Sequence, residues 1–258
     1  MRVRLRQVAL VAADLAPVEA GIIEELGVEL CYRDPDVEVF GLKNALFPIG
    51  DKLLEVVSPV RAGTTAGRQL DKRKGDGGYM VILQVDDLDE MKRRIETHNV
   101  RVVFTATRPD IAGIHLHPKD VGAAILSVDQ TDQWDDWGWA GPDWRHHIAT
   151  RVVTDMVGVA MQSEHPASTA ERWAALVGGA VTAIGDEYHV HLAEGVLRFV
   201  PLGDDRGDGV CAVDLRAADA RTRSTTLCGV TINFVACRGL TCYPQLRFDP
   251  QVGLCAIC

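Results

Sequence analysis

A short pattern of apolar residues recurs along this chain, and it restricts the folds open to the chain more than any other feature. An apolar run of strand length is followed by an amphipathic helix and then by three more apolar runs. The first copy starts with residues 8–12 and the second with residues 80–85. Asp14 and either Asp86 or Asp87 stand where the two helices need caps. We therefore predict a repeated unit of one strand, one helix and three strands.

Four copies of this unit can be placed on the sequence. In the first copy we expect a helix ending near residue 27 and strands over residues 37–42, 45–49 and 53–57. In the second we expect a helix over residues 88–95 and strands over residues 102–105, 113–117 and 122–128. The third should have strands over residues 157–161, 188–192 and 196–200 and a helix over residues 169–177. The fourth should have a helix near residues 218–226 and strands over residues 210–215, 229–235, 245–248 and 252–257.

Pairing of the units predicts the domain organisation. One helix cannot cover both faces of a four-stranded sheet, so two units must pair to make a domain. We predict an α+β chain with a first domain over residues 1–130 and a second over residues 151–258. Residues 131–150 show no hydrophobic periodicity and form the predicted linker, which carries four tryptophans, Trp134, Trp137, Trp139 and Trp144. Because tryptophan gains most from burying its large surface, packing is the favoured role, with closure over a cleft as the alternative.

Composition and charge exclude several classes of protein. The chain has 258 residues and is 47% hydrophobic, which is enough for a substantial core. Its 36 acidic and 27 basic residues give a net charge of −9, which is unfavourable for binding nucleic acid or anionic membranes. The N-terminal apolar run stops at Asp14, too early for a secretory signal or a membrane span. We therefore expect a cytoplasmic protein without a nucleic-acid or membrane partner.

Cysteine usage does not indicate a disulfide framework or a metal site. Five of the seven cysteines fall in the last 31 residues, at positions 228, 237, 242, 255 and 258. A framework of disulfides would be spread along the chain. The spacing of the last four cysteines also matches that of zinc ribbons poorly.

The repeat, the helix caps and the sequence Leu116-His117-Pro118-Lys119-Asp120 together resemble the vicinal oxygen chelate superfamily. This superfamily includes glyoxalase I, methylmalonyl-CoA epimerase, extradiol dioxygenases and the bleomycin resistance proteins. The chain is similar to tandem glyoxalase-like proteins of the epimerase branch, and residues 5–130 carry the resemblance best. The resemblance implies four βαβββ modules that form two glyoxalase-like domains, each with a curved mixed sheet around a cleft for a small molecule.

The resemblance also implies where a metal would bind. In this superfamily a divalent ion is held by the first and last strands of each unit, and the matching positions of the first domain are Gln7, Glu55, Met80 and Ser127. The two spacings agree, since 55 − 7 = 48 and 127 − 80 = 47. A thioether and a neutral hydroxyl are poor ligands for hard divalent ions. We therefore predict no tight metal site and leave the cofactor unassigned.

Glu55 is the predicted catalytic residue. It interrupts the apolar sequence Leu53-Leu54-Glu55-Val56-Val57. Since a carboxylate is rarely buried without a partner, Glu55 either faces a pocket or lies at an exposed edge of the strand. In a pocket, burial would raise its pKa and make it a candidate general base.

Six other residues are predicted to bind the substrate: Gln7, Met80, His115, His117, Ser127 and Arg68. His115 and His117 alternate with apolar residues and should share a strand face, although half-exposed histidines without a function also show this pattern. Arg68 belongs to the basic, glycine-rich segment 61–78, which either binds an anionic group or is a solvated connection. Arg198 of the second domain either anchors an acid or pairs with a carboxylate.

Two functions agree with these observations. The first is a lyase or isomerase that acts on a small carbonyl or thioester compound in the first cleft, with Glu55 as the base or sole carboxylate ligand. The alternative is a metal-free protein of the bleomycin-resistance type that sequesters a small organic molecule. The resemblance allows a homodimer, and the fold does not decide between enzyme and binding protein.

Overall fold

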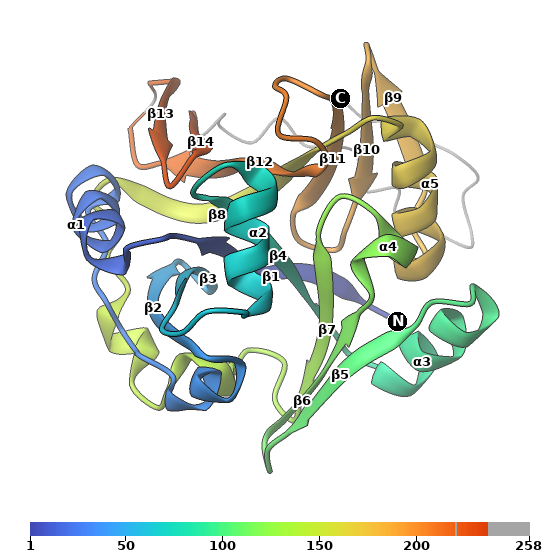
Figure 1. The fold of residues 1–258 in the computed structure, drawn as a ribbon, viewed down its shortest axis with the longest axis horizontal. Coiled ribbons are helices and arrows are strands. Elements are labelled where there is room, and N and C mark those ends of the chain that lie inside the picture. Colours follow the sequence, from blue (N-terminus) through green and yellow to red (C-terminus); the bar gives the residue numbers. More distant parts are fainter. Residues whose placement is uncertain (220, 237–258) are drawn as a thin grey trace, which may run out of the picture.

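In the described part of the chain, each half contains a seven-stranded mixed sheet (Figure 1). The computed structural model describes residues 1–219 and 221–236. The first sheet has the order β2-β3-β1-β4-β7-β6-β5 and the second has the order β13-β14-β12-β8-β11-β10-β9. The strands of the first sheet are β1 (Val3–Val11), β2 (Leu42–Ile49), β3 (Lys52–Pro59), β4 (Gly77–Val85), β5 (Val102–Thr107), β6 (Ile111–Leu116) and β7 (Ile125–Thr131). Those of the second are β8 (Val153–Ser163), β9 (Val181–Ile184), β10 (Glu187–His191), β11 (Val196–Pro201), β12 (Gly209–Ala217), β13 (Arg223–Leu227) and β14 (Val230–Val235).

The strand pairing follows the predicted repeat. In each sheet the first strands of two units lie antiparallel at the centre, as β1 with β4 and β8 with β12. The last strand of each unit then pairs with the first strand in parallel, for example β3 with β1. Each sheet is therefore built from two related halves, which confirms the predicted α+β class with mixed sheets.

The helices begin and end at the residues that their capping chemistry requires. α1 (Leu15–Leu26) is capped by Asp14 and ends at Gly27, which adopts φ +62°. α3 (Leu88–Thr97) is capped by Asp87. The other helices are α2 (Thr65–Arg73), α4 (Pro118–Val121), α5 (Pro166–Val177) and the 3₁₀ helices η1 (Pro35–Phe40), η2 (Gly138–Ala140) and η3 (Trp144–His147). None of the helices in residues 1–219 and 221–236 is long and apolar enough to cross a membrane.

Two predicted elements are wrong. Residues 37–42 form no strand, because Asp34 caps η1, Pro35 begins it and Gly41 ends it in the left-handed conformation. The fourth unit has no helix at residues 218–226, since only five residues connect β12 to β13 and an α-helical turn already takes almost four. The first sheet accordingly has seven strands and not eight. The described part of the second sheet also has seven, and two of them, β9 and β13, were not predicted. The strands predicted at residues 245–248 and 252–257 lie outside the described residues.

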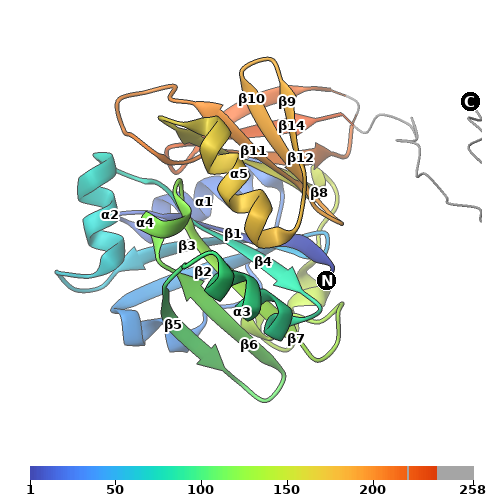
Figure 2. The same cartoon turned by 90° about the vertical axis from the view of Figure 1, so that its right-hand side faces the viewer.

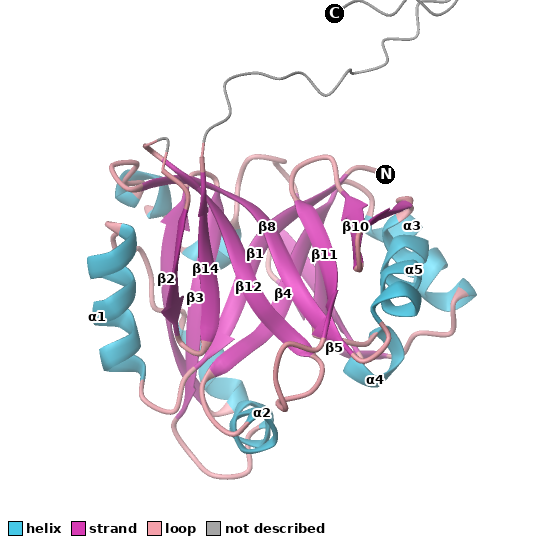
Figure 3. Cartoon of the chain, turned by 90° about the horizontal axis from the view of Figure 1, so that it is seen from above, coloured by secondary structure: helices cyan, strands magenta, loops and turns pink. Residues whose placement is uncertain are grey.

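One apolar core joins the two sheets. One face of the first sheet, with residues such as Leu10, Val56 and Leu126, belongs to the same buried cluster as Val213 and Phe199 of the second sheet. Figure 3 shows the two sheets stacked, with α1 at one end of the layer and α3 and α5 at the other. Figure 2 shows α5 of the second half lying close to α4 and α3 of the first. The opposite face of the first sheet is left to form a cavity.

Candidate functional site

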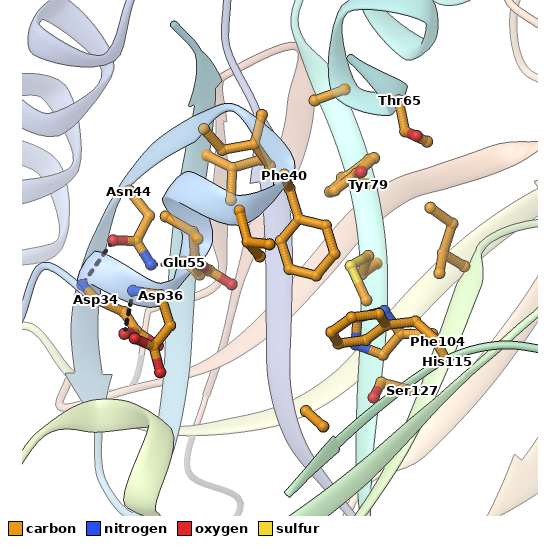
Figure 4. A pocket seen from close by; sticks show the side chains of 18 of the residues that line it. Asp34, Asp36, Phe40, Asn44, Glu55, Thr65, Tyr79, Phe104, His115 and Ser127 are labelled. Atoms are coloured by element: carbon orange, nitrogen blue, oxygen red, sulfur yellow. Dashed lines mark hydrogen bonds between the residues drawn. The ribbon is translucent and has the colours of Figure 1, made fainter.

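A cavity of about 1000 Å³ lies against the free face of the first sheet. The residues on this face alternate along the strands with those of the shared core, as Glu55 does between Leu54 and Val56. The segment containing η1 and the loop before α2 complete the walls, and much of the lining is apolar. Figure 4 shows Glu55 and Asn44 on one side of the cavity and His115 and Ser127 on the other.

Five of the seven predicted site residues line this cavity: Gln7, Glu55, Met80, His115 and Ser127. They come from β1, β3, β4, β6 and β7, which lie next to one another in the sheet. The structure thus brings together residues that are up to 120 positions apart in the chain. The roles predicted for them remain predictions.

Glu55 is buried, with 8% of its surface exposed, and it accepts two hydrogen bonds from neutral amides. The Gln7 side chain donates from Nε2 to Glu55 Oε2 at 2.9 Å, and the Asn44 side chain donates from Nδ2 to Glu55 Oε1 at 2.7 Å. No cation among the described residues pairs with this carboxylate. Burial raises the pKa of Glu55 above its usual value, while the two amide donors act in the opposite direction. Glu55 therefore holds a proton more tightly than an exposed glutamate does.

A second buried carboxyl group, Asp129, lines the same cavity and was not predicted. Its Oδ1 accepts from Ser127 Oγ at 2.6 Å and its Oδ2 accepts from Trp139 Nε1 at 2.6 Å. Burial raises the pKa of Asp129 to about 7, although both donors favour the charged form. The sequence did contain a sign that Asp129 belongs to the site. Asp129 follows Ser127 at i, i+2 spacing, which places both side chains on one strand face.

Gly113 makes room for the Asp129 carboxyl group. The two residues are opposite each other on β6 and β7. A Cβ atom at position 113 would lie 2.7 Å from Asp129 Cγ, which is too close for any side chain. The missing side chain at this position therefore determines where the carboxyl group can lie.

The predicted linker contributes directly to the cavity. Trp137 and Trp144 are buried, as packing residues should be. Trp137 also donates from Nε1 to Gln7 Oε1 at 2.8 Å, and Trp139 donates to Asp129. One indole N–H group thus holds the Gln7 amide beside Glu55 and the other holds the Asp129 carboxyl group directly, a role that composition alone did not indicate.

His115 and His117 do not share a face, contrary to the prediction. β6 ends at Leu116, and His117 caps α4, with its Nδ1 accepting from the Lys119 backbone N–H at 3.1 Å. His117 does not line the cavity, whereas His115 does. Burial lowers the pKa of His115 to about 4, so its ring is neutral at physiological pH. The ring lies 5.0 Å from that of Phe104.

η1 is held across the mouth of the cavity by charged and aromatic contacts. Arg108 pairs with Asp34 at 2.9 Å and with Asp36. Phe40, at the other end of η1, contacts Phe104 of β5 with ring centroids 4.8 Å apart. η1 therefore links the first half of the sheet to the second half over the cavity.

Two other cationic candidates lie outside this site. Arg68 is exposed on α2 and donates to Gly63 O and Thr65 Oγ1, and it does not line the cavity. Arg198 pairs with the carboxylates of Asp214 and Glu187 in the second sheet, which is the second of the two roles predicted for it.

The four positions that hold a metal in the superfamily do not fit a divalent ion here. Gln7 Oε1 is engaged by Trp137, and Gln7 turns its Nε2 toward Glu55. Ser127 donates its hydroxyl proton to Asp129, and Met80 offers only a thioether. Both Glu55 oxygens already accept hydrogen bonds. In the described part of the chain, no group of three or more His, Cys, Asp or Glu residues is placed to hold a metal.

Comparisons with known proteins agree with the predicted resemblance. No family model matches the chain. The chain is 25% identical over 130 residues to mitochondrial methylmalonyl-CoA epimerase of Bos taurus, which is 49% of this chain and 74% of that protein. It is 24% identical over 130 residues to the Mus musculus protein of the same name, and the match covers 49% of this chain and 72% of that protein. A hypothetical protein from Staphylococcus aureus of known crystal structure matches with a TM-score of 0.66 and 13% identity, covering 91% of this chain and 99% of that one.

The last comparison concerns the fold alone, and it extends over both sheets because it covers nearly the whole chain. The sequence similarity to the epimerases covers about half of the chain. The chain therefore has the tandem fold of the vicinal oxygen chelate superfamily, built from two glyoxalase-like halves.

Proposed function

We propose that this protein is an isomerase or lyase that transfers a proton at the carbon next to a carbonyl or thioester group, with Glu55 as the general base. The ionised Glu55 takes the α-proton, and the C–H electron pair moves into an enolate. In an isomerase the protonated carboxyl group then returns the proton to the enolate; in a lyase the enolate electrons expel a β-substituent, and the carboxyl group gives the proton to that leaving group. The neutral ring of His115 lines the cavity and has an N–H group that can donate to the enolate oxygen.

The observation that carries this proposal is the environment of Glu55. A buried carboxylate that has two neutral donors and no paired cation has a raised pKa, which suits a base working near neutral pH. Much of the cavity wall around the group is apolar, which favours the neutral acid and so keeps the pKa raised. Similarity to methylmalonyl-CoA epimerase supports a CoA thioester as the first substrate class to test.

Hydrogen exchange tests the proposal directly. The protein is incubated in D₂O with methylmalonyl-CoA and other small acyl-CoA thioesters, and deuterium at the α-carbon is followed by mass spectrometry. We expect exchange by the wild type and a loss of about 10²–10⁴-fold in Glu55→Gln, as for removal of a general base. Glu24→Gln is the control, since Glu24 is an exposed carboxylate on α1 and should leave the rate unchanged.

The alternative is a binding protein without catalytic activity. The large and mostly apolar cavity would serve such a protein equally well. Ligands that raise the melting temperature of the wild type but undergo no exchange would favour this alternative. Exchange that survives in Glu55→Gln would contradict the assignment of the base.

A further inference from the structure

A chain of hydrogen bonds leads from the linker to Glu55. The Trp137 indole donates to Gln7 Oε1 at 2.8 Å, and Gln7 Nε2 donates to Glu55 Oε2 at 2.9 Å. Gln7 and Trp137 are both buried, at 3% and 0% exposure. We propose that Trp137 is a positioning residue that fixes the Gln7 amide with its NH₂ group facing Glu55. This inference rests on the proposed function of Glu55 as the base.

The donors and acceptors of the two side chains determine this orientation. The indole N–H can only donate, whereas an amide offers an oxygen on one side and an NH₂ group on the other. If the Gln7 amide turned over, its NH₂ group would face the indole N–H and its oxygen would face Glu55. Two donors would then oppose each other in a buried site, which is costly. Trp137 therefore excludes the turned amide.

The orientation of the amide affects the charge state of Glu55. An NH₂ group that faces the carboxylate stabilises its ionised form, whereas an amide oxygen in the same place would stabilise the protonated form. Among the described residues, the titratable groups whose charges interact with Glu55 are Asp34, which caps η1, and Tyr79 on β4, and neither carries a positive charge. Gln7 and Asn44 are thus the groups that keep Glu55 able to act as a base.

The chain contains a matched control for this inference. Trp144 is a second buried linker tryptophan, and Arg6 lies over both rings, 5.2 Å from the Trp137 centroid and 5.4 Å from the Trp144 centroid. The Trp144 indole N–H, however, has no hydrogen-bond partner among the described residues. Replacing either tryptophan with phenylalanine therefore removes a similar volume and a similar contact with Arg6, but only Trp137→Phe removes a hydrogen bond.

The experiment measures the titration of Glu55 without any substrate. In protein with ¹³C-labelled glutamate, the Glu55 carboxyl signal is assigned by its absence in Glu55→Gln and followed against pH by NMR. In Trp137→Phe we expect the midpoint to rise by about one pH unit, a tenfold change in the protonation equilibrium. In Trp144→Phe we expect the wild-type midpoint. The pH profile of α-proton exchange should shift with the midpoint.

A double-mutant cycle tests whether the effect passes through Gln7. Gln7→Leu alone should raise the Glu55 midpoint, and adding Trp137→Phe to it should cause no further change. The inference is overturned if folded Trp137→Phe titrates like the wild type, or if its shift persists in the Gln7→Leu background. Because the titration needs no turnover, a protein without exchange activity would disprove the proposed function while leaving this result intact.

Discussion

At the scale of single residues, the site combines two carboxyl groups in similar surroundings. Glu55 and Asp129 each accept two hydrogen bonds from neutral donors, and neither is paired with a cation among the described residues. Neutral donors only partly replace the water that a carboxylate loses on burial. This is why burial dominates and both pKa values are raised.

The Asp129 carboxyl group should make stability depend on pH. Its pKa is about 7 in the folded protein and about 3.9 in an unfolded chain, so the folded state holds the proton more tightly. Its favourable contribution is complete below about pH 4 and is lost as the pH rises through about 7. The substitution Asp129→Asn would mimic the protonated acid, because the amide oxygen can accept from Trp139 and the amide NH₂ group can face Ser127.

Urea unfolding of the wild type and Asp129→Asn between about pH 4.5 and 8.5 checks this prediction. The wild type should lose stability relative to the variant as the pH rises, with an upper limit of about 4 kcal/mol for a shift of about three pH units. Glu55 is present in both proteins, so its contribution cancels. A stability difference that is constant across this range would show that Asp129 is ionised throughout.

At the scale of secondary-structure elements, the cavity is closed by segments that are not part of the sheet. η1 stands where the sequence suggested a strand, and it links the first half of the sheet to β5 and β6 through Arg108 and Phe40. In the linker, Trp137 directly precedes η2 and donates a hydrogen bond to Gln7. Trp139 lies within η2 and donates to Asp129. Segments outside the sheet thus supply the indole donors that hold Gln7 and Asp129.

Arg108→Gln should loosen η1 from the sheet. The substitution removes the ion pairs of Arg108 with Asp34, which is partly buried, and with Asp36, which is exposed, so we expect a loss of about 1 kcal/mol of stability. Amide hydrogen exchange of residues 34–41 should become faster, while exchange in β1 and β4 should not change. Arg93→Gln, which removes an exposed ion pair on α3, is the control. Unchanged exchange in η1 would mean that Phe40 holds the segment alone.

At the scale of the whole molecule, the two predicted domains share one core. We propose that the described parts of the two predicted domains, residues 1–130 and residues 151–219 and 221–236, have separate sheets but unfold together. The linker is fixed against the first sheet by its buried tryptophans, so it joins the two halves without acting as a free hinge.

Phe199→Ala tests this cooperativity. Phe199 is fully buried in the second sheet next to Trp173, and its truncation should cost about 3–5 kcal/mol. Unfolding followed by tryptophan fluorescence, which reports mainly on the linker, should move together with unfolding followed by circular dichroism. Ile184→Ala, on the exposed edge strand β9, should change stability little. Two separate transitions, of which only one moves, would show that the halves unfold independently.

The sequence by itself determined the repeated unit and the cap of α1, and it narrowed the cap of α3 to Asp86 or Asp87. It left open whether Glu55 faces a pocket or an exposed edge of β3. The repeated unit and the caps depend on residues close together in the chain, where alternation and capping chemistry act directly. η1 also had local signals in Asp34, Pro35 and Gly41, but the apolar character of residues 37–42 outweighed them.

The superfamily resemblance already placed Gln7 beside Glu55, but only the tertiary structure decided which other donors meet the two carboxyl groups. Trp137 is 130 positions from Gln7, and Gln7 is 48 positions from Glu55, so no local pattern relates them. The linker showed no periodicity because its tryptophans pack into the free face of a sheet and form no regular element of their own. The raised pKa of Asp129 likewise depends on burial beneath Trp139 and against Gly113, which folding alone creates.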